Sequence, residues 1–436
     1  MVPIPTIRLA FLLAVAAVLT AASPFGQPVS ALVIVGVVAV LALIDFLRTA
    51  DPAAIEVERE IGGSLPLGAE TTVKWRVHNT TERNQIVAIA DEFAPSLGAT
   101  SRRALATIPG RATASISTIL RPSRRGRFRI SELVLRLRSP WGLIERQRTR
   151  QMPQILRVLP LFRSRQEAEL LVIKAKQLDM GIRSARGRGT GTEFDQLREY
   201  TPDDEFRRID WAATARTGTT IARTYRSELN QTVINLLDNG RVMAGVVADV
   251  PRVEHAMDAV MALTTVATGL GDKCGLLTFD REVVSIVQPS RSRSQLGRVT
   301  EAMYDLNPAL VESDYRGAFT AALQHFRRRT MIVVHTELIG AVAEDFLLPA
   351  LPLISRSHIV VIATVRDPLV GEWASSTVTD ADTAYRQSSA TQALAERERT
   401  IAALKARGAL VVDAAPGELA GRLAETYIKV KAAGTL

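Results

Sequence analysis

The fold of the C-terminal half is decided by the stretch Val233-Ile234-Asn235-Leu236-Leu237-Asp238, an apolar run that ends in an acidic residue. Short apolar runs of this kind are typical of strands that are buried on both faces. Further runs lie at residues 274–279, 331–334, 358–365 and 410–412, and helical spacing is present at residues 253–270, 295–304, 315–327, 391–407 and 417–431. Strands that alternate with helices predict a mostly parallel sheet covered by helices, over residues 229–436.

Ligands gather at the carboxyl ends of the strands in a sheet of this kind, which directs attention to Asp238 and Glu337. The arrangement resembles a von Willebrand factor A domain, whose metal site takes the pattern D-x-S-x-S after the first strand and an aspartate after the fourth. In this chain Gly240 and Val242 replace both hydroxyl ligands, and Glu337 stands at the later aspartate position. Magnesium requires near-ideal octahedral oxygen geometry. The sequence therefore favours a capping role for Asp238 over a magnesium ion held by Asp238 and Glu337, and we expect no cofactor.

Residues 51–161 show a different pattern, in which apolar and polar residues often alternate. The apolar members are two positions apart, as in Val73, Trp75 and Val77. A period of two is typical of strands with one buried face. Turn-forming clusters separate these runs, and no long helical pattern interrupts them. This region is therefore predicted to form an antiparallel β-sandwich of immunoglobulin-like type.

Residues 1–50 contain two apolar runs, 9–22 and 29–44, joined by an uncharged loop. They predict a two-helix, multi-pass membrane anchor, although each run is slightly shorter than the roughly 20 residues that span a bilayer. Arg8 precedes the first run and Arg48 follows the second, so the bias of positive charge places both ends in the cytoplasm. If the first run were a cleaved signal peptide, the second would stop transfer. Both alternatives predict a protein of the cell membrane with cytoplasmic soluble domains.

Residues 162–228 form a linker, with one helix expected at residues 166–178, followed by a segment in which acids and arginines are interleaved around aromatic side chains. This segment is too charged to be a core and too patterned to be a plain linker. Its composition indicates a surface that binds a partner protein. The candidate partner-binding residues are Glu193, Arg198, Tyr200, Asp204, Arg208, Asp210, Trp211 and Arg216.

Two other functions remain open for the charged residues of this region. Glu193, Asp204 or Asp210 could act as general acid or base in an enzyme of the cell envelope. Neighbouring arginines would hold such acids ionised, which makes them poor proton donors. The basic run from Arg183 to Arg188 could bind nucleic acid, but no aromatic residue accompanies it for base stacking. We expect partner binding and no catalytic residue.

Composition and the remaining motifs bound the function further. The chain has 436 residues and a formal net charge of +9, which suits an anionic membrane surface. Cys274, its single cysteine, opens an apolar run and is expected to be a buried, reduced thiol. The five histidines have no ligand spacing, and the chain contains neither a phosphate-binding loop ending in Gly-Lys-Ser/Thr nor a Gly-x-Ser-x-Gly elbow. The sequence gives no support to a zinc site, an ATPase or a serine hydrolase.

The charged segment also carries a family resemblance. Gly191, Glu193-Phe194, Leu197-Arg198-Glu199-Tyr200, Pro202, Asp204, Arg208-Ile209-Asp210-Trp211, Ala215-Arg216 and Glu228 resemble the bacterial family catalogued as domain of unknown function 58. Arg124-Arg125-Gly126, Ser139-Pro140-Trp141-Gly142-Leu143 and the two apolar runs are similar to it as well. Asp203 departs from the pattern, because the family usually has glycine there.

Members of this family are often encoded near AAA+ ATPases of the MoxR type, so the resemblance implies a chaperone-like or assembly role. We therefore expect a membrane-anchored cytoplasmic adaptor that docks a protein partner, with a MoxR-type ATPase as the candidate.

Overall fold

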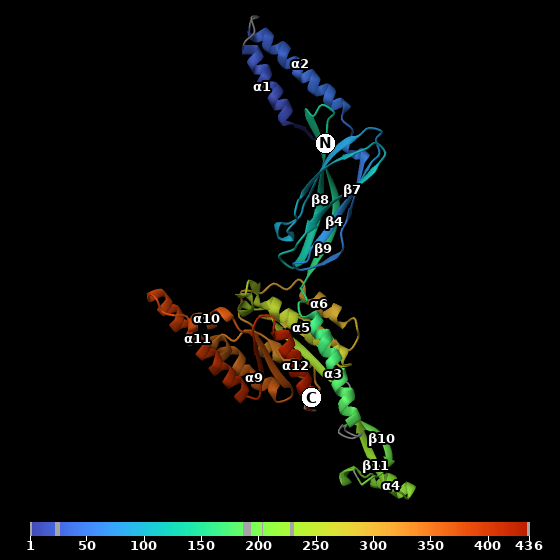
Figure 1. The fold of residues 1–436 in the computed structure, drawn as a ribbon, viewed down its shortest axis with the longest axis vertical. Helices are drawn as coiled ribbons and strands as arrows, with labels where there is room; N and C mark the ends of the chain where they lie inside the picture. Colours follow the sequence, from blue (N-terminus) through green and yellow to red (C-terminus); the bar gives the residue numbers. More distant parts are fainter. Residues whose placement is uncertain (1, 22–26, 186–192, 203, 227–230, 434–436) are drawn as a thin grey trace. The chain divides into compact units, whose positions relative to one another are not determined.

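The computed structural model describes residues 2–21, 27–185, 193–202, 204–226 and 231–433 (Figure 1). The chain divides into two compact units, residues 1–159 and 160–436. Asp203 and residues 186–188 of the basic run lie outside the described residues.

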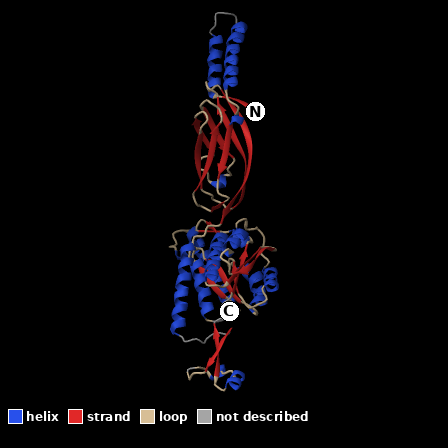
Figure 2. Ribbon diagram, turned by 90° about the vertical axis from the view of Figure 1, so that its right-hand side faces the viewer, coloured by secondary structure: helices blue, strands red, loops and turns tan. Residues whose placement is uncertain are grey.

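The first unit contains two apolar helices, α1 (Ile7–Ala21) and α2 (Gln27–Arg48), which lie side by side (Figures 1 and 2). Many of their large apolar side chains face outward, including Phe11, Leu32 and Leu47. Within the described residues, one helix is long and apolar enough to cross a membrane, and it falls in residues Val29–Ala54. A rise of about 1.5 Å per residue makes α2 about 33 Å long, close to the hydrocarbon thickness of a bilayer, whereas α1 is shorter.

The rest of the first unit is built from two sheets. A three-stranded sheet has the order β2-β4-β7, and a six-stranded sheet has the order β1-β9-β8-β5-β6, with β3 paired to β9. The strands are β1 (Val2–Pro5), β2 (Ile55–Glu60), β3 (Ser64–Pro66), β4 (Thr71–Asn79), β5 (Gln85–Asp91), β6 (Arg103–Ile108), β7 (Thr113–Leu120), β8 (Gly126–Arg138) and β9 (Ile144–Leu159). Single helical turns lie at Pro52–Ala54 and Pro95–Leu97.

Both sheets contribute to one hydrophobic core. Val73, Trp75 and Val77 of β4 are buried in the same cluster as Val87 and Ile89 of β5. Side chains between them along β4 are mostly exposed, as the period of two predicted. The strands of this region are confirmed, and the finer assignment to the immunoglobulin-like class stays a prediction.

The second unit is organised around a six-stranded sheet of order β16-β15-β12-β17-β18-β19. All neighbours are parallel except β16, which pairs antiparallel with β15 at the edge. The strands are β12 (Thr232–Asp238), β15 (Lys273–Phe279), β16 (Val283–Ser290), β17 (Met331–His335), β18 (Ile359–Val365) and β19 (Leu410–Ala414). The sequence predicted five of these strands and missed β16, whose residues are mostly half-buried.

Helices cover both faces of this sheet. The core on one face is formed with α3 (Arg165–Ala185), α5 (Arg252–Gly269) and α12 (Leu419–Ala432). The core on the other face is formed with α7 (Tyr315–His325), α9 (Leu348–Ser355) and α11 (Ala381–Ala406). Shorter elements are α6 (Gln295–Met303), α8 (Gly340–Val342), α10 (Pro368–Ser375), β13 (Val246–Val247), β14 (Val250–Pro251) and helical turns at Arg241–Ala244 and Ala343–Leu347.

Two helices are longer than the sequence predicted. The helix expected at residues 391–407 begins ten residues earlier, where Asp380 and Thr383 form a capping box. The linker helix expected at residues 166–178 extends through Ala185 as α3. Ala168 of α3 is buried in the core, so the first part of the predicted linker belongs to the α/β unit.

The charged segment forms a small structure of its own. Strands β10 (Glu193–Glu199) and β11 (Ile221–Arg226) pair antiparallel, and a helical turn (Phe206–Arg208) and α4 (Trp211–Thr217) lie between them in the chain.

Candidate functional site

The carboxyl ends of β12 and β17 bring Asp238 close to Thr336. The two strands are parallel neighbours, with Leu237 opposite His335. The next residue in each strand direction, Asp238 and Thr336, is therefore opposite its counterpart. The Thr336 hydroxyl donates a hydrogen bond to Asp238 Oδ2 at 2.6 Å. The sequence analysis named Asp238 at this edge and did not name Thr336.

Asp238 is completely buried, and four donors surround its carboxylate. Besides Thr336, these donors are the Ser313 hydroxyl at 2.5 Å, the Tyr315 hydroxyl at 2.8 Å and the Gly240 N–H at 2.8 Å. Burial raises the pKa of Asp238, and the four hydrogen bonds oppose this rise. Burial and the neighbouring Asp238 also raise the pKa of Tyr315 well above its ordinary value. The phenol therefore stays a hydrogen-bond donor.

These residues do not fit a magnesium ion. Tyr315 points its hydroxyl at the carboxylate oxygen that Thr336 also contacts, and the two hydroxyls lie 2.8 Å apart. At position 240, a Cβ atom would lie 2.0 Å from Ser313 Oγ and 3.0 Å from the Val311 carbonyl oxygen. The serine that the D-x-S-x-S pattern requires there has no room. The described residues also contain no group of three or more His, Cys, Asp or Glu that could hold a metal ion.

This misfit leads to a prediction for Gly240→Ser, the change that restores part of the metal pattern. The new Cβ must displace Ser313, and overpacking of this kind typically costs about 1–3 kcal/mol. We expect a lower Tm in thermal unfolding and no rise in Tm when magnesium is added. Gly371→Ser is the matched control, because a Cβ at position 371 meets nothing within 4 Å. A rise in the Tm of the Gly240→Ser protein with magnesium would contradict the prediction.

Glu337 lies at the same edge but has different partners. It is buried, and its Oε1 accepts a hydrogen bond from Arg397 Nη1 at 2.5 Å. Its Oε2 lies 3.0 Å from Arg252 Nε and accepts a weaker bond from the Thr364 hydroxyl at 3.3 Å. Arg397 also donates to Asp413 at 2.9 Å. Two guanidinium groups thus neutralise the carboxylate that the metal pattern would use.

This charge cluster joins both helical layers to the sheet. Arg252 comes from α5 on one face and Arg397 from α11 on the other, while Asp413 comes from β19. Burial opposes the charge of Arg397, but its bonds to Asp413 and Glu337 outweigh that effect and raise its pKa. The sequence analysis missed Arg252, Arg397 and Asp413. The available signal was the position of Asp413 directly after the last predicted strand, residues 410–412.

Cys274 and His335 are structural. Cys274 is buried and unpaired, as expected, and burial raises its pKa to about 11, so the thiol is a poor nucleophile. Burial lowers the pKa of His335 to about 3, and its Nε2 lies 2.9 Å from Asn235 Oδ1. Both side chains contribute to the centre of the sheet.

In the charged segment, Asp204 organises the turn that follows β10. Its Oδ2 accepts hydrogen bonds from the Thr201 N–H and hydroxyl, both at 2.9 Å, and its Oδ1 accepts one from Arg198 at 2.5 Å. The Thr201 N–H bond contributes most to lowering the pKa of Asp204. Tyr200 donates from its hydroxyl to the Asp204 carbonyl. Three of the predicted residues thus form one turn.

Asp210 performs a second local task in the segment. It caps α4 by accepting a hydrogen bond from the Ala213 N–H at 3.0 Å, and its other oxygen accepts one from Arg223 Nε at 2.8 Å. The Arg223 bond is the largest influence that lowers the pKa of Asp210. Arg208 pairs with Glu205, and Arg216 donates to the Ala212 carbonyl. These ion pairs close within the segment. Glu193 lies in β10, and its side chain is outside the described part of the chain.

Among the described residues of the segment, the most exposed large apolar side chains are aromatic. Phe206 is 69% exposed and Trp211 is 60% exposed. Their rings are in edge-to-face contact, with centroids 5.8 Å apart. The sequence analysis named Trp211 and missed Phe206. Two exposed arginines are near these rings in the sequence: Arg207 follows Phe206 directly, and Arg216 lies five residues after Trp211.

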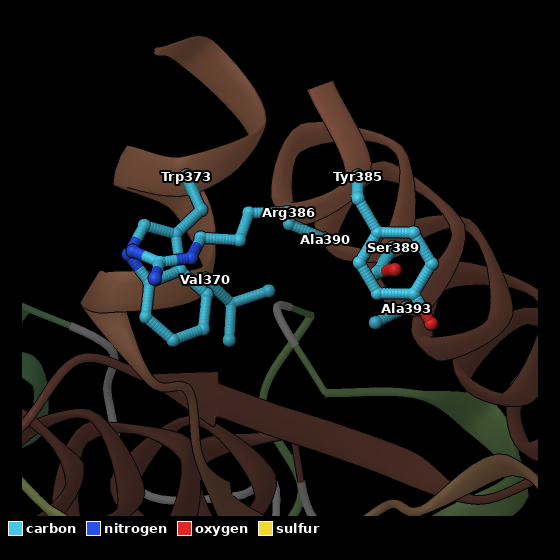
Figure 3. A pocket seen from close by; sticks show the side chains of 7 residues that line it. All are labelled: Val370, Trp373, Tyr385, Arg386, Ser389, Ala390 and Ala393. Atoms are coloured by element: carbon cyan, nitrogen blue, oxygen red, sulfur yellow. The ribbon is translucent and has the colours of Figure 1, made fainter. Parts of the chain in front are cut away.

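A separate apolar pocket of about 210 Å³ lies between α10 and α11 (Figure 3). The rings of Trp373 and Tyr385 stand at its two sides, and Arg386 extends across it (Figure 3). Its lining residues are Val370, Trp373, Tyr385, Arg386, Ser389, Ala390 and Ala393. The sequence analysis missed it, because it placed the start of the helix beyond most of the lining residues.

Comparison with known protein families identifies the charged segment and most of the α/β unit. Residues 196–408 match the model of the family described as Protein of unknown function DUF58. The DUF58 resemblance seen in the sequence is confirmed over these residues, and the match includes Phe206, Trp211, Asp238, Glu337 and Arg397.

Similar curated proteins carry names that assign no function. Uncharacterized protein Rv1480 of Mycobacterium tuberculosis and uncharacterized protein Mb1516 of Mycobacterium bovis are each 29% identical to this DUF58-matching chain over 183 residues. The alignment covers 41% of this chain and 56% of each relative, so the chain spans about half the length of the relatives it matches. No enzymatic family is indicated by these matches.

Two solved structures show distant similarity. The conserved hypothetical protein BatB from Bacteroides thetaiotaomicron aligns at 13% identity and a TM-score of 0.31, covering 47% of this chain and all of that one. The vWF domain of the type V pili tip protein Mfa5 from Porphyromonas gingivalis aligns at 14% identity and a TM-score of 0.22, covering 26% of this chain and 39% of that one.

Proposed function

We propose that this protein is a membrane-anchored adaptor that binds a partner protein through the segment formed by β10, α4 and β11. The observation that carries the proposal is the exposed pair Phe206 and Trp211. Large aromatic side chains dominate the binding energy of many protein interfaces. Two such rings, exposed in a small two-stranded structure that has little core of its own, are suited to insertion into a partner.

The acids of the segment support binding more than catalysis. Asp204 and Asp210 both have lowered pKa values and are held by local hydrogen bonds. Near pH 7 they are ionised, so neither serves as a proton donor. Their contacts maintain the turn that precedes Phe206 and the helix that begins at Trp211, which accounts for both residues without a reaction.

We place the protein at the membrane through α2, with α1 packed beside it to complete a two-helix anchor. The apolar side chains that α2 exposes support this placement. Arg8 and Arg48 lie at the same end of the pair, which favours a cytoplasmic location for the soluble units.

The partner that we propose is an AAA+ ATPase of the MoxR type, on the basis of the family resemblance. We expect the partner to have an apolar pocket for the two aromatic rings, with acidic residues around it. Such acidic residues would be complementary to the exposed charges of Arg207 and Arg216.

The test is co-purification of the full-length protein from detergent-solubilised membranes, with and without ATP, comparing wild type with Trp211→Ala. Truncating a central aromatic residue of an interface typically costs about 2 kcal/mol or more, roughly a 30-fold loss of affinity. We expect the ATPase with wild type and its loss with Trp211→Ala.

Trp373→Ala is the matched control, since it removes a 40% exposed tryptophan from α10. Circular dichroism would verify that both variants are folded. Equal recovery of the ATPase with wild type and Trp211→Ala would place the docking surface elsewhere, and no ATPase in any condition would refute the proposed partner.

A further inference from the structure

The turn Ser139-Pro140-Trp141-Gly142-Leu143 contacts the ends of both apolar helices. The guanidinium carbon of Arg48, at the end of α2, lies 5.6 Å from the centroid of the Trp141 ring. Arg8, in the first turn of α1, donates a hydrogen bond from Nη1 to the Trp141 carbonyl at 3.2 Å. Two arginines that are 40 residues apart in the sequence thus meet at one tryptophan.

A buried carboxylate holds the turn in position. Asp45, in the last turns of α2, is completely buried and accepts hydrogen bonds from the N–H groups of Trp141 and Leu143, both at 2.9 Å. The Ser139 hydroxyl also donates to Asp45. The carboxylate is therefore held by donors of the turn itself. Both carboxylate oxygens of Asp45 accept hydrogen bonds from the turn.

Gly142 allows the close approach of Arg8. Its φ of +73° lies in the left-handed region that favours glycine, and a Cβ there would be 3.0 Å from Arg8 Nη1. The Thr6 hydroxyl further joins the start of α1 to the turn by donating to the Gly142 carbonyl at 2.6 Å. The contacts of Ser139 with Asp45 and of Gly142 with Arg8 explain why the turn contains these two residues. The proposed adaptor role does not involve this turn.

The surface of this junction is basic, aromatic and exposed. Trp141 is 41% exposed, and both arginines are exposed. A guanidinium stacked on a ring keeps N–H groups that can bind a phosphate oxygen. The helices that lead to it expose Ile7 and Leu47, which are suited to the apolar part of a bilayer. Tryptophan and arginine at the boundary of such helices are typical of residues at lipid headgroup depth.

We infer that Arg8, Trp141 and Arg48 form a binding site for the phosphate of an anionic phospholipid headgroup. The inference rests on the membrane anchorage proposed above. It assigns a ligand class to the junction: a diacyl lipid whose acyl chains lie against the helices and whose net negative charge is shared by the two guanidinium groups.

The test uses the full-length protein in nanodiscs, with Trp211→Phe and Trp373→Phe so that Trp141 and the buried Trp75 remain. Brominated phosphatidylglycerol and brominated phosphatidylcholine, at the same mole fraction, serve as fluorescence quenchers. We expect the anionic lipid to quench Trp141 more strongly, by about twofold, as expected from local enrichment of anionic lipid near basic residues. The excess should disappear in R8Q/R48Q and persist in R103Q, which removes an exposed arginine of β6.

Equal quenching by the two lipids, or an excess that survives R8Q/R48Q, would overturn the inference. Loss of the excess when inorganic phosphate is added at constant ionic strength would also overturn it, because the site would then bind free phosphate. Extraction with alkaline carbonate separates the two proposals: a protein that is extracted refutes the membrane anchor itself, whereas an unextracted protein without excess quenching refutes only the lipid site.

Discussion

Asp91→Leu is expected to lower the free energy of unfolding of the β-rich region by about 3–5 kcal/mol, the usual cost of removing one partner from a buried ion pair. Asp91 and Arg59 have side-chain exposures of 0% and 1%. Arg59 donates from Nε and Nη2 to the two carboxylate oxygens at 2.8 and 2.7 Å. Trp75 donates its ring N–H to the same carboxylate at 2.7 Å. Without Asp91, the Trp75 ring N–H loses its acceptor. The buried Arg59 guanidinium loses its carboxylate partner and keeps the Met152 carbonyl, which lies 3.0 Å from Nη1.

The double variant Arg59→Met with Asp91→Leu separates charge burial from packing. It removes the unpaired guanidinium, so we expect most of the lost stability to return, with about 1–3 kcal/mol still missing because Trp75 has no acceptor. Urea denaturation followed by the fluorescence of Trp75 measures both variants, in a background where the other three tryptophans are phenylalanine. A double variant that is less stable than Asp91→Leu would show that the ion pair is not the source of the effect.

Arg397→Met is expected to destabilise the α/β unit by a similar amount, about 3–5 kcal/mol. The substitution leaves Glu337 with Arg252 as its remaining ion-pair partner and removes the bidentate partner of Asp413. All three groups of the Arg397 ion pairs are mostly shielded from solvent, so screening reduces the effect little. Because the cluster connects α11 and α5 to the sheet, we expect faster hydrogen exchange in β19 and in both helices.

Arg399→Met provides the comparison, since Arg399 is an exposed arginine of the same helix. A surface change of this kind is expected to alter stability by less than about 0.5 kcal/mol. Equal hydrogen exchange in the two variants would show that the cluster does not hold the helices to the sheet. Urea unfolding monitored through Trp373 gives an independent measurement.

The period of the apolar residues was sufficient to predict the main elements of both units. The alternation of Val73, Trp75 and Val77 predicted a strand, and the run ending at Asp238 predicted a buried strand of a parallel sheet. This works because the period of a pattern reflects which side chains a regular backbone directs inward. The edge strand β16 and the early start of α11 were missed, because partly exposed elements carry a weaker pattern.

The residues by themselves also identified the charged segment, since acids, arginines and aromatic side chains at fixed spacing are a local property. Their pairing was decided by the tertiary structure: Asp210 meets Arg223 only because β11 returns to the start of α4. Tyr315 reaches Asp238, and Arg397 reaches Glu337, across 77 and 60 positions of the chain. The sequence determined which segments are strands, helices and surface, because these depend on near neighbours. Whether Asp238 and Glu337 face a cation or protein donors depended on groups that only the folded sheet brings together.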